Sequence, residues 1–204
     1  MSAQMLPDEI RFMQRILCSA GCYTGPKNGV WSRAVDDAEA QLKTIADQLA
    51  AECGPFDDRS ERCIRSLHPK AQRAAREFLR TLRGTGVDAR IISGTRTYPE
   101  QDALYRRGRF GDTSPRVTNA KAGQSNHNFG VAWDIGIFVN GKYIEGKNNA
   151  ENALYNQVAA LRDNAVLEWG GEWTTFVDRP HYQLKGVGGV ADLAAKFEKG
   201  TAYA

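Results

Sequence analysis

Apolar residues that recur every three or four positions predict the helices of this chain. One such stripe follows residues 8–20, with Gly21 suited to end the helix, and a longer stripe follows residues 32–52. A third helix is expected to begin at Pro69, because proline favours the first helical turn, and to end near Gly84. Shorter helices are expected over residues 99–107, 150–166 and 189–199.

Alternation of large apolar residues with small or polar ones predicts the strands. Residues 87–93 alternate in this way, and so do residues 131–138. The dipeptide Asn140-Gly141 then predicts a tight hairpin turn into a strand at 142–144. Residues 174–184 are expected to be extended. Helices mixed with hairpins in this order predict an α+β fold with a small antiparallel sheet.

A turn-rich segment, Gly54–Ser60, is the best candidate for a linker between domains. Only helices are expected before it, and both helices and strands after it. We therefore predict a small all-helical domain over residues 1–62 and an α+β domain over residues 63–204.

Composition and charge narrow the class of protein. The 204 residues are 42% hydrophobic and 25% charged, which excludes a disordered, collagen-like or coiled-coil chain. Residues 1–62 carry 7 Lys/Arg against 10 Asp/Glu, whereas residues 63–204 carry 20 against 14. A basic domain is attracted to nucleic acid, membrane surfaces or an anionic cell wall, although an ordinary soluble surface is an equal alternative. No aromatic-rich basic stretch of the nucleic-acid-binding kind occurs, so no nucleic acid partner is expected.

The N-terminus and the cysteines bear on localisation. Residues 1–9 have neither the positive nor the apolar region of a secretory signal, and no run approaches the roughly 18 apolar residues of a membrane span. A chain made in the cytoplasm is expected, and something other than a standard signal would carry it to any other compartment. The sequence contains no C-x-x-C pair, so a zinc site with four thiolate ligands is not expected. Reduced thiols and two disulfides of unknown connectivity both stay open for Cys18, Cys22, Cys53 and Cys63.

Two of the three histidines stand in unusual contexts. His127 precedes the predicted strand 131–138 across Gly130, which permits a sharp turn. On that strand, Asp134 shares a face with small residues that would leave room above it. A histidine and an aspartate brought together in this way can supply two ligands to a Zn²⁺ ion.

The second context is the segment Phe176–Tyr182. Its His181 could be a third metal ligand, and three protein ligands leave one tetrahedral position for water, as in catalytic zinc sites. Asp178 lies three residues earlier, where its carboxylate could act as a general base without binding the metal. Lone histidines are nevertheless more often ordinary core or surface residues.

These two motifs resemble those of the M15 family of peptidoglycan metallopeptidases. The first matching motif is Ser125-x-His127-x-x-Gly130-x-Ala132-x-Asp134, and the second is Asp178-x-Pro180-His181. Further blocks resemble the family in the same order: Leu67-His68-Pro69, Ser93-Gly94-Thr95-Arg96-Thr97 with Gln101, Val117–Ala120 and Trp169–Trp173. The resemblance covers about residues 64–184, which is nearly the whole second domain.

The resemblance implies a zinc site and a catalytic base. His127, Asp134 and His181 would hold Zn²⁺. Asp178 would take a proton from the attacking water and pass it to the departing nitrogen. Many relatives have glutamate at this position, and aspartate is found in the endopeptidase branch.

The resemblance also assigns supporting roles. Arg96 would stabilise the developing oxyanion, with a structural ion pair as the alternative. Ser125 and Gln101 would shape the substrate site or support the ligands. Glu168 and Glu172 are rival bases by residue type alone, and their spacing from the second motif favours them less than Asp178.

Which bond is cut follows from the same comparison. The Trp169–Trp173 block followed by Asp-x-Pro-His most resembles the branch that cleaves between L-alanine and D-glutamate. The alternative is the branch that removes D-alanine from D-alanyl-D-alanine termini. Cleavage by either route needs no serine or cysteine nucleophile.

Residues 10–35 resemble, more weakly, a helical peptidoglycan-binding module. Ala38-Glu39 stands where that module has a Phe-Gln pair, and Asn28-Gly29 where it has Asp-Gly. Both glycan binding and a helical cap on the enzyme therefore stay open.

The sequence thus predicts a monomeric, zinc-dependent enzyme whose partner is peptidoglycan. A phage lysis enzyme is preferred to a secreted antibacterial effector. The alternative of another class is a wall-binding protein that keeps the fold and has lost turnover.

Overall fold

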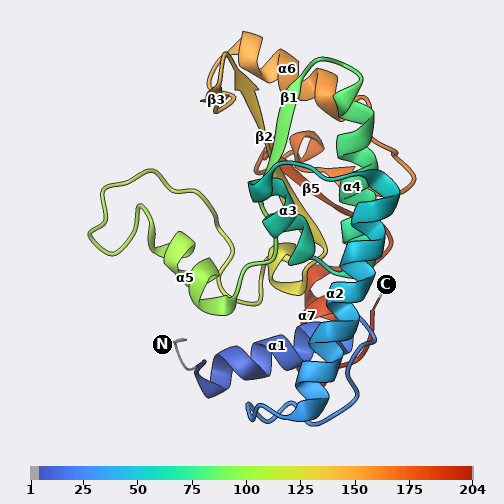
Figure 1. The fold of residues 1–204 in the computed structure, drawn as a ribbon. Coiled ribbons are helices and arrows are strands. Elements are labelled where there is room, and N and C mark those ends of the chain that lie inside the picture. Colours follow the sequence, from blue (N-terminus) through green and yellow to red (C-terminus); the bar gives the residue numbers. More distant parts are fainter. Residues whose placement is uncertain (1–4, 204) are drawn as a thin grey trace. The chain divides into compact units, whose positions relative to one another are not determined.

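A computed structural model describes residues 5–203 and confirms the α+β fold class. Its helices and strands are drawn in Figure 1. Contacts between Cα atoms divide the chain into two units, Met1–Ile45 with Arg96–Phe129 and Val187–Ala204, and Ala46–Thr95 with Gly130–Gly186. The first is called unit 1 below, and the second unit 2. Within residues 5–203, no helix has both the length and the apolar character needed to cross a membrane.

Unit 2 is built on an antiparallel sheet in the order β1-β2-β5-β4, with β3 also paired to β2. The strands are β1 (Asp88–Ser93), β2 (Ala132–Val139), β3 (Lys142–Ile144), β4 (Leu167–Trp169) and β5 (His181–Leu184). The apolar residues that alternate along β2 are almost fully buried, as their spacing predicts. The predicted extended segment 174–184 is a strand only in its last four residues.

The hairpin between β2 and β3 confirms the turn prediction. Asn140 and Gly141 have φ angles of 51° and 74°, and a two-residue turn with both angles positive suits the twist of antiparallel strands. Gly136 of β2 allows its neighbours to approach closely. A Cβ on Gly136 would lie 2.8 Å from the Ile92 side chain and 3.1 Å from the Tyr143 ring.

Three further helices belong to unit 2: α3 (Asp58–Arg65), α4 (Pro69–Arg83) and α6 (Asn149–Ala159). Helix α4 confirms the prediction, with the His68 side chain accepting from the N–H of Lys70 at its start. Helix α3 was not predicted, and it occupies part of the candidate linker. Helix α6 ends seven residues before the predicted boundary at 166, and a turn from Asp163 leads into β4.

A buried ion pair joins α3 to α4. The guanidinium of Arg76 is fully buried and donates to both carboxylate oxygens of Glu61 at 2.7 and 2.8 Å. Glu61 also accepts from the N–H of Phe56 at 3.1 Å. Glu61 thus neutralises the charge of Arg76, which would otherwise be buried without a partner.

Unit 1 contains α1 (Pro7–Ser19), the first part of α2 (Arg33–Cys53), α5 (Tyr98–Arg106), the short 3-10 helix η1 (Asn126–Phe129) and α7 (Val190–Lys199). Phe197 of α7 lies 5.3 Å from the ring centre of Phe12 and 5.5 Å from that of Phe129. The Tyr203 hydroxyl donates to the carbonyl of Phe129 at 2.6 Å. Helix α1 therefore shares a core with the C-terminal helix.

The packing of α1 on α7 bears on the predicted domain division at residue 62. It is the contact that a helical cap would make, because α7 belongs to the predicted peptidase domain. The division into modules 1–62 and 63–204 stays a prediction. The four cysteines are free thiols, and burial raises the pKa of Cys18, Cys22 and Cys63.

Candidate metal centre

Asp134 and His181 face each other across two paired strands. They are direct partners in the antiparallel register of β2 and β5. His181 Nδ1 lies 3.5 Å from Asp134 Oδ1, and both side chains are largely buried. The N–H of Ile135 donates to the carbonyl of Pro180 at 2.8 Å, which extends the pairing to the residue just before β5. Two potential metal ligands are thus fixed by sheet register.

His127 enters from the short helix η1, just before β2. The N–H of Asn128 donates to the carbonyl of Ser125 at 2.9 Å, which tightens the turn that carries the histidine. Gly130 follows with a φ of 70°, and its carbonyl accepts from the N–H of His68 at 2.9 Å. A larger residue would be strained at this φ.

His127, Asp134 and His181 each offer a ligand atom, and these atoms all lie within 4.8 Å of one another. Two imidazoles and one carboxylate are a common ligand set for a divalent transition metal ion. Both histidines are buried, at 2% and 5% exposure, so their ring nitrogens are shielded from bulk water. The group could therefore hold a metal ion, as the predicted ligands require.

Gln183 orients the imidazole of His181. Its Oε1 lies 2.9 Å from His181 Nε2, and an amide oxygen can only accept a hydrogen bond. When Nε2 carries the proton it donates to this oxygen, and Nδ1, the nitrogen that faces Asp134, then keeps its lone pair. Burial lowers the pKa of His181, but the hydrogen bond and charge of Asp134 outweigh it, and the net pKa is raised.

Two tryptophans brace the segment that leads to His181. The ring of Trp173 lies 4.9 Å from that of His181, and its indole N–H donates to Glu168 Oε1 at 2.8 Å. The indole N–H of Trp169 donates to the carbonyl of Arg179 at 2.7 Å. The Trp169–Trp173 block thus gives β5 and the preceding turn a rigid neighbour.

Asp178 is held close to the end of β4 by a glycine. Its N–H donates to the carbonyl of Gly170 at 3.0 Å, and its own carbonyl accepts from the N–H of His181 at 3.3 Å. A Cβ on Gly170 would lie only 2.5 Å from the Asp178 carbonyl oxygen. The backbone of Asp178 can approach this closely only because residue 170 has no side chain. Asp178 is half-buried, and its charge acts on the imidazole of His181.

The two alternative candidates for the base, Glu168 and Glu172, each bind another side chain. Glu168 accepts from the indole of Trp173, as described above. Glu172 pairs with the guanidinium of Arg162 at 2.6 Å. Which of these three carboxylates acts as the base stays a prediction.

Arg96 follows a backbone packed tightly on the end of α3. A Cβ on Gly94 would lie 2.4 Å from the Cys63 carbonyl oxygen, and the N–H of Thr95 donates to Ser66 Oγ at 2.9 Å. In unit 1, the N–H of Arg96 donates to the carbonyl of His127 at 3.0 Å. The main chain of the predicted oxyanion-stabilising residue is thus bonded directly to that of a predicted metal ligand.

Ser125 and Gln101, the two predicted substrate-site residues, both belong to the structure around the turn that carries His127. Ser125 begins the turn that carries His127 and is half-buried. Gln101, on α5, is fully buried, and its side-chain nitrogen donates to the carbonyl of Ala120 at 2.8 Å. This bond ties α5 to the segment before Ser125. Gln101 therefore supports that segment, and a direct contact with substrate stays a prediction.

Comparisons with known proteins were consistent with this geometry. A family model described as D-alanyl-D-alanine carboxypeptidase, of the peptidase M15 type, matches residues 118–184. The peptidoglycan L-alanyl-D-glutamate endopeptidase CwlK of Bacillus subtilis (strain 168) is 32% identical over 124 residues, which cover 58% of this chain and 73% of that protein. The chain belongs to the peptidase M15 family.

Two further relatives of this M15 chain are also peptidases by name. The L-alanyl-D-glutamate peptidase of Listeria phage A118 is 28% identical over 136 residues, which are 65% of this chain and 44% of that protein. The crystal structure of the L-Ala D-Glu endopeptidase ChiX of Serratia marcescens is 31% identical, covering 64% of this chain and 89% of its own, with a TM-score of 0.45.

Sequence reasoning missed two residues that shape the site. Gln183 lies two positions after His181, and residues two apart on a strand share a face. That spacing was a usable signal once residues 181–184 were taken as a strand. The close approach of Gly170 to Asp178 had no such signal, because it depends on how β4 and the turn before β5 meet.

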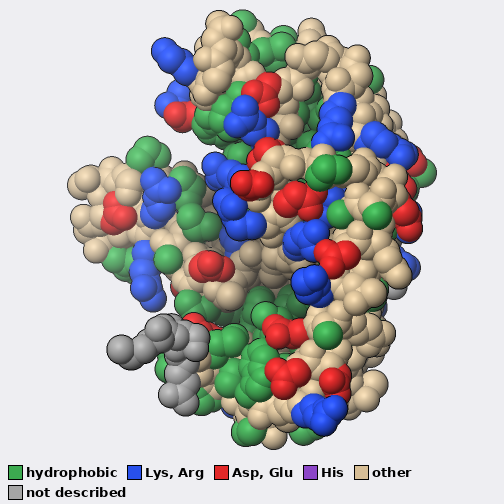
Figure 2. All heavy atoms as spheres, in the orientation of Figure 1, with side chains coloured by type: hydrophobic (Ala, Val, Ile, Leu, Met, Phe, Trp, Pro, Cys, Tyr) green, Lys and Arg blue, Asp and Glu red, His purple; other side chains and the backbone are tan. Residues whose placement is uncertain are grey.

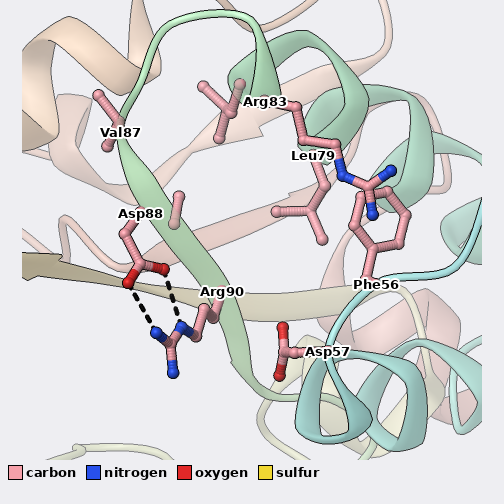
Figure 3. Close-up of a pocket in the computed structure, with 9 residues that line it drawn as sticks. Phe56, Asp57, Leu79, Arg83, Val87, Asp88 and Arg90 are labelled. Carbon is pink, nitrogen blue, oxygen red and sulfur yellow. Dashed lines mark hydrogen bonds and ion pairs between the residues drawn. The ribbon is translucent and has the colours of Figure 1, made fainter. Parts of the chain in front are cut away.

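Unit 2 also contains a pocket with a different lining, of about 410 Å³, shown in Figure 3. Its charged groups already have partners within the chain. Arg90 donates to both oxygens of Asp88 at 2.8 and 2.6 Å, and the Arg83 guanidinium lies 4.1 Å from the centre of the Phe56 ring. The pocket includes none of the predicted site residues.

Proposed function

We propose that this M15 chain hydrolyses the stem peptides of peptidoglycan between L-alanine and D-glutamate, with a Zn²⁺ ion held by His127, Asp134 and His181. The observation that carries the proposal is the convergence of these three ligand atoms within 4.8 Å. The bond specificity is supported by the names of the similar B. subtilis and Listeria phage proteins.

The donor set fits zinc because two neutral imidazoles and one carboxylate leave one tetrahedral position open. When bound, Zn²⁺ would polarise the scissile carbonyl and lower the pKa of water toward about 7. With the proton of His181 on Nε2, Gln183 Oε1 accepts from it at 2.9 Å, and Nδ1 would then be the ligand atom. Such outer partners fix ligand orientation.

Asp178 performs the proton transfers. Its carboxylate takes a proton from the water that attacks the peptide carbonyl, and it gives the proton to the departing D-glutamate nitrogen. An aspartate reaches less far than a glutamate, and the missing side chain at Gly170 lets the Asp178 backbone lie closer to β4. The guanidinium of Arg96 stabilises the negative charge that develops on the carbonyl oxygen.

A D,D-carboxypeptidase is the second candidate, because the matching family model carries that description. The two activities act on different bonds of the same stem peptide. A catalytically silent wall-binding protein is disfavoured by the presence of both the ligand group and Asp178.

We also propose a biological role in lysis, with a phage lysis enzyme preferred to a secreted antibacterial effector. The similar peptidase of Listeria phage A118 supports this choice. The enzyme would act on the cell wall, and its N-terminal helices would either bind glycan or cap the enzyme.

Metal removal tests the proposal. Purified protein is stripped with a strong chelator and assayed on isolated peptidoglycan, and Zn²⁺ is then restored in equimolar amount. Activity should vanish and return, with one zinc bound per chain by elemental analysis. The variant His181→Ala should bind no zinc. Full activity in the stripped protein would contradict a metal-dependent mechanism.

A further inference from the structure

A strongly basic segment connects α5 to η1. Residues 106–121, called the basic loop here, carry five basic side chains and one acidic one, a net charge of +4, whereas the whole chain has +3. Residues 107–125 contain no helix or strand. Arg106, Arg107 and Arg116 are exposed and form no ion pair with any carboxylate of residues 5–203. The loop is therefore a local positive patch, in which five basic side chains face a single carboxylate, that of Asp112.

An aromatic side chain projects from the same loop. Phe110 is 83% exposed, the highest value among the large hydrophobic residues described. Its φ of 55° is unusual for a bulky residue, because the left-handed region is crowded by a Cβ. Val117 is also 41% exposed. Figure 2 shows hydrophobic and basic side chains side by side on the surface that α5 and this loop form.

Hydrogen bonds hold the base of the loop in place, and Phe110 projects from this ordered base. Arg109 donates to the carbonyls of Tyr105 and Thr118 at 2.6 and 3.0 Å and to Asn119 Oδ1 at 2.9 Å. Its guanidinium also stacks on the Tyr105 ring, 4.1 Å from the ring centre. Arg109 thereby joins the two ends of the loop. Arg116 donates from Nε to the Gly108 carbonyl at 3.3 Å, and the Phe110 ring lies 6.5 Å from the Tyr105 ring.

We propose that the basic loop docks this protein on an anionic lipid surface. Basic side chains are attracted to anionic headgroups, and an exposed aromatic ring gains by entering the boundary between headgroups and acyl chains. A hydrated wall polymer could pair with the arginines. It offers no apolar phase for Phe110 and Val117, so the combination of charge and apolar exposure favours lipid.

Vesicle sedimentation tests the proposal on the full chain. Wild-type protein should co-sediment with vesicles of equal parts phosphatidylglycerol and phosphatidylcholine, and not with vesicles of phosphatidylcholine alone. Binding should weaken at high salt, because the headgroup attraction is screened.

Two variants locate the contact. The triple change Arg106→Gln, Arg107→Gln and Arg116→Gln should weaken binding about fivefold per arginine, on the order of 100-fold in total. Phe110→Asn should weaken it about tenfold, and asparagine tolerates the positive φ. The matched control changes three exposed arginines outside the loop, Arg33→Gln, Arg62→Gln and Arg80→Gln, and should retain most of the binding. Thermal unfolding of each variant shows that it is folded.

Equal losses in the two triple variants would overturn the proposal, because net charge alone would then explain binding. Loop-dependent binding to isolated peptidoglycan, with none to anionic vesicles, would also overturn it and assign the loop to the wall.

Discussion

Asp178 and Gln183 show how single residues near His181 divide the work of the site. Asp178 stands on the turn before β5 and Gln183 on the strand itself, and each is bonded to a different part of His181. In the proposed mechanism, the first offers a carboxylate for proton transfer, and the second holds the imidazole of His181 by its Nε2 atom. Neither residue needs to bind the metal to be essential.

Asp178→Asn is expected to lower kcat by about 10²–10⁴-fold, because an amide cannot accept the proton of water. Zinc content should stay at one per chain. The matched control is Glu168→Gln, whose amide oxygen can still accept from Trp173 and which should keep wild-type activity. Activity measured on isolated peptidoglycan decides between them. A larger loss in the Glu168 variant would move the base assignment to Glu168.

Gln183→Leu should reduce zinc affinity by about 10–100-fold, because the His181 tautomer is no longer fixed. A competition titration with a coloured chelator measures the affinity. The ¹⁵N chemical shifts of the histidine rings report the tautomer without reference to activity. Unchanged shifts and affinity would show that Gln183 does not position His181.

At the scale of elements, the close approach of β4 to the turn before β5 positions Asp178, the proposed base. Gly170→Ala would place a methyl group 2.5 Å from the Asp178 carbonyl oxygen, so the turn must move. Activity should fall about tenfold or more, with a stability loss of about 1–3 kcal/mol. Gly84→Ala is the matched control, since neither glycine has a positive φ and a Cβ on Gly84 would meet its nearest atom, the Thr81 carbonyl oxygen, at 3.8 Å. Similar activity losses in both variants would argue against a specific role for Gly170.

The α3–α4 ion pair makes stability sensitive to acid. Burial alone would raise the pKa of Glu61, but hydrogen bonds from Arg76 and the Phe56 N–H, with the charges of Arg76 and Arg65, lower it below its usual 4.5. A lowered carboxyl pKa contributes stability above pH 4.5 that is lost as the pH falls through the folded-state value.

Glu61→Gln should therefore cost about 3 kcal/mol at neutral pH, because Arg76 stays buried without its charge partner. Urea unfolding followed between pH 7 and pH 3 checks both effects. The variant should lose less stability than the wild type on acidification. An equal acid sensitivity in the two proteins would show that Glu61 is not responsible.

The elements that sequence predicted are those with a local signal. The spacing of apolar residues gave α1, α2 and α4, and Asn140-Gly141 gave the β2–β3 turn. Helix α3 was missed because its residues are mostly polar, with Ser60 and Ile64 its buried positions. Ser60 Oγ accepts from the N–H of Ile91 on β1 at 2.9 Å, a tertiary contact with no signal in the local sequence.

At the scale of the whole chain, the site depends on residues far apart in sequence. His127 and His181 are separated by 53 intervening positions, and no periodicity relates them. Their grouping was predicted from the resemblance to M15 peptidases, whereas the Asp134–His181 pairing needed the sheet register. Strand pairing is non-local, and it is the step that sequence pattern alone does not provide.

The most direct test of the account is to digest purified peptidoglycan with the zinc-loaded protein and to identify the new termini by mass spectrometry. We predict new L-alanine C-termini together with free D-glutamate N-termini, and none in the Asp178→Asn variant. Release of single D-alanine instead would contradict the endopeptidase assignment and identify a carboxypeptidase. Absence of any product with zinc bound would contradict the enzymatic account itself.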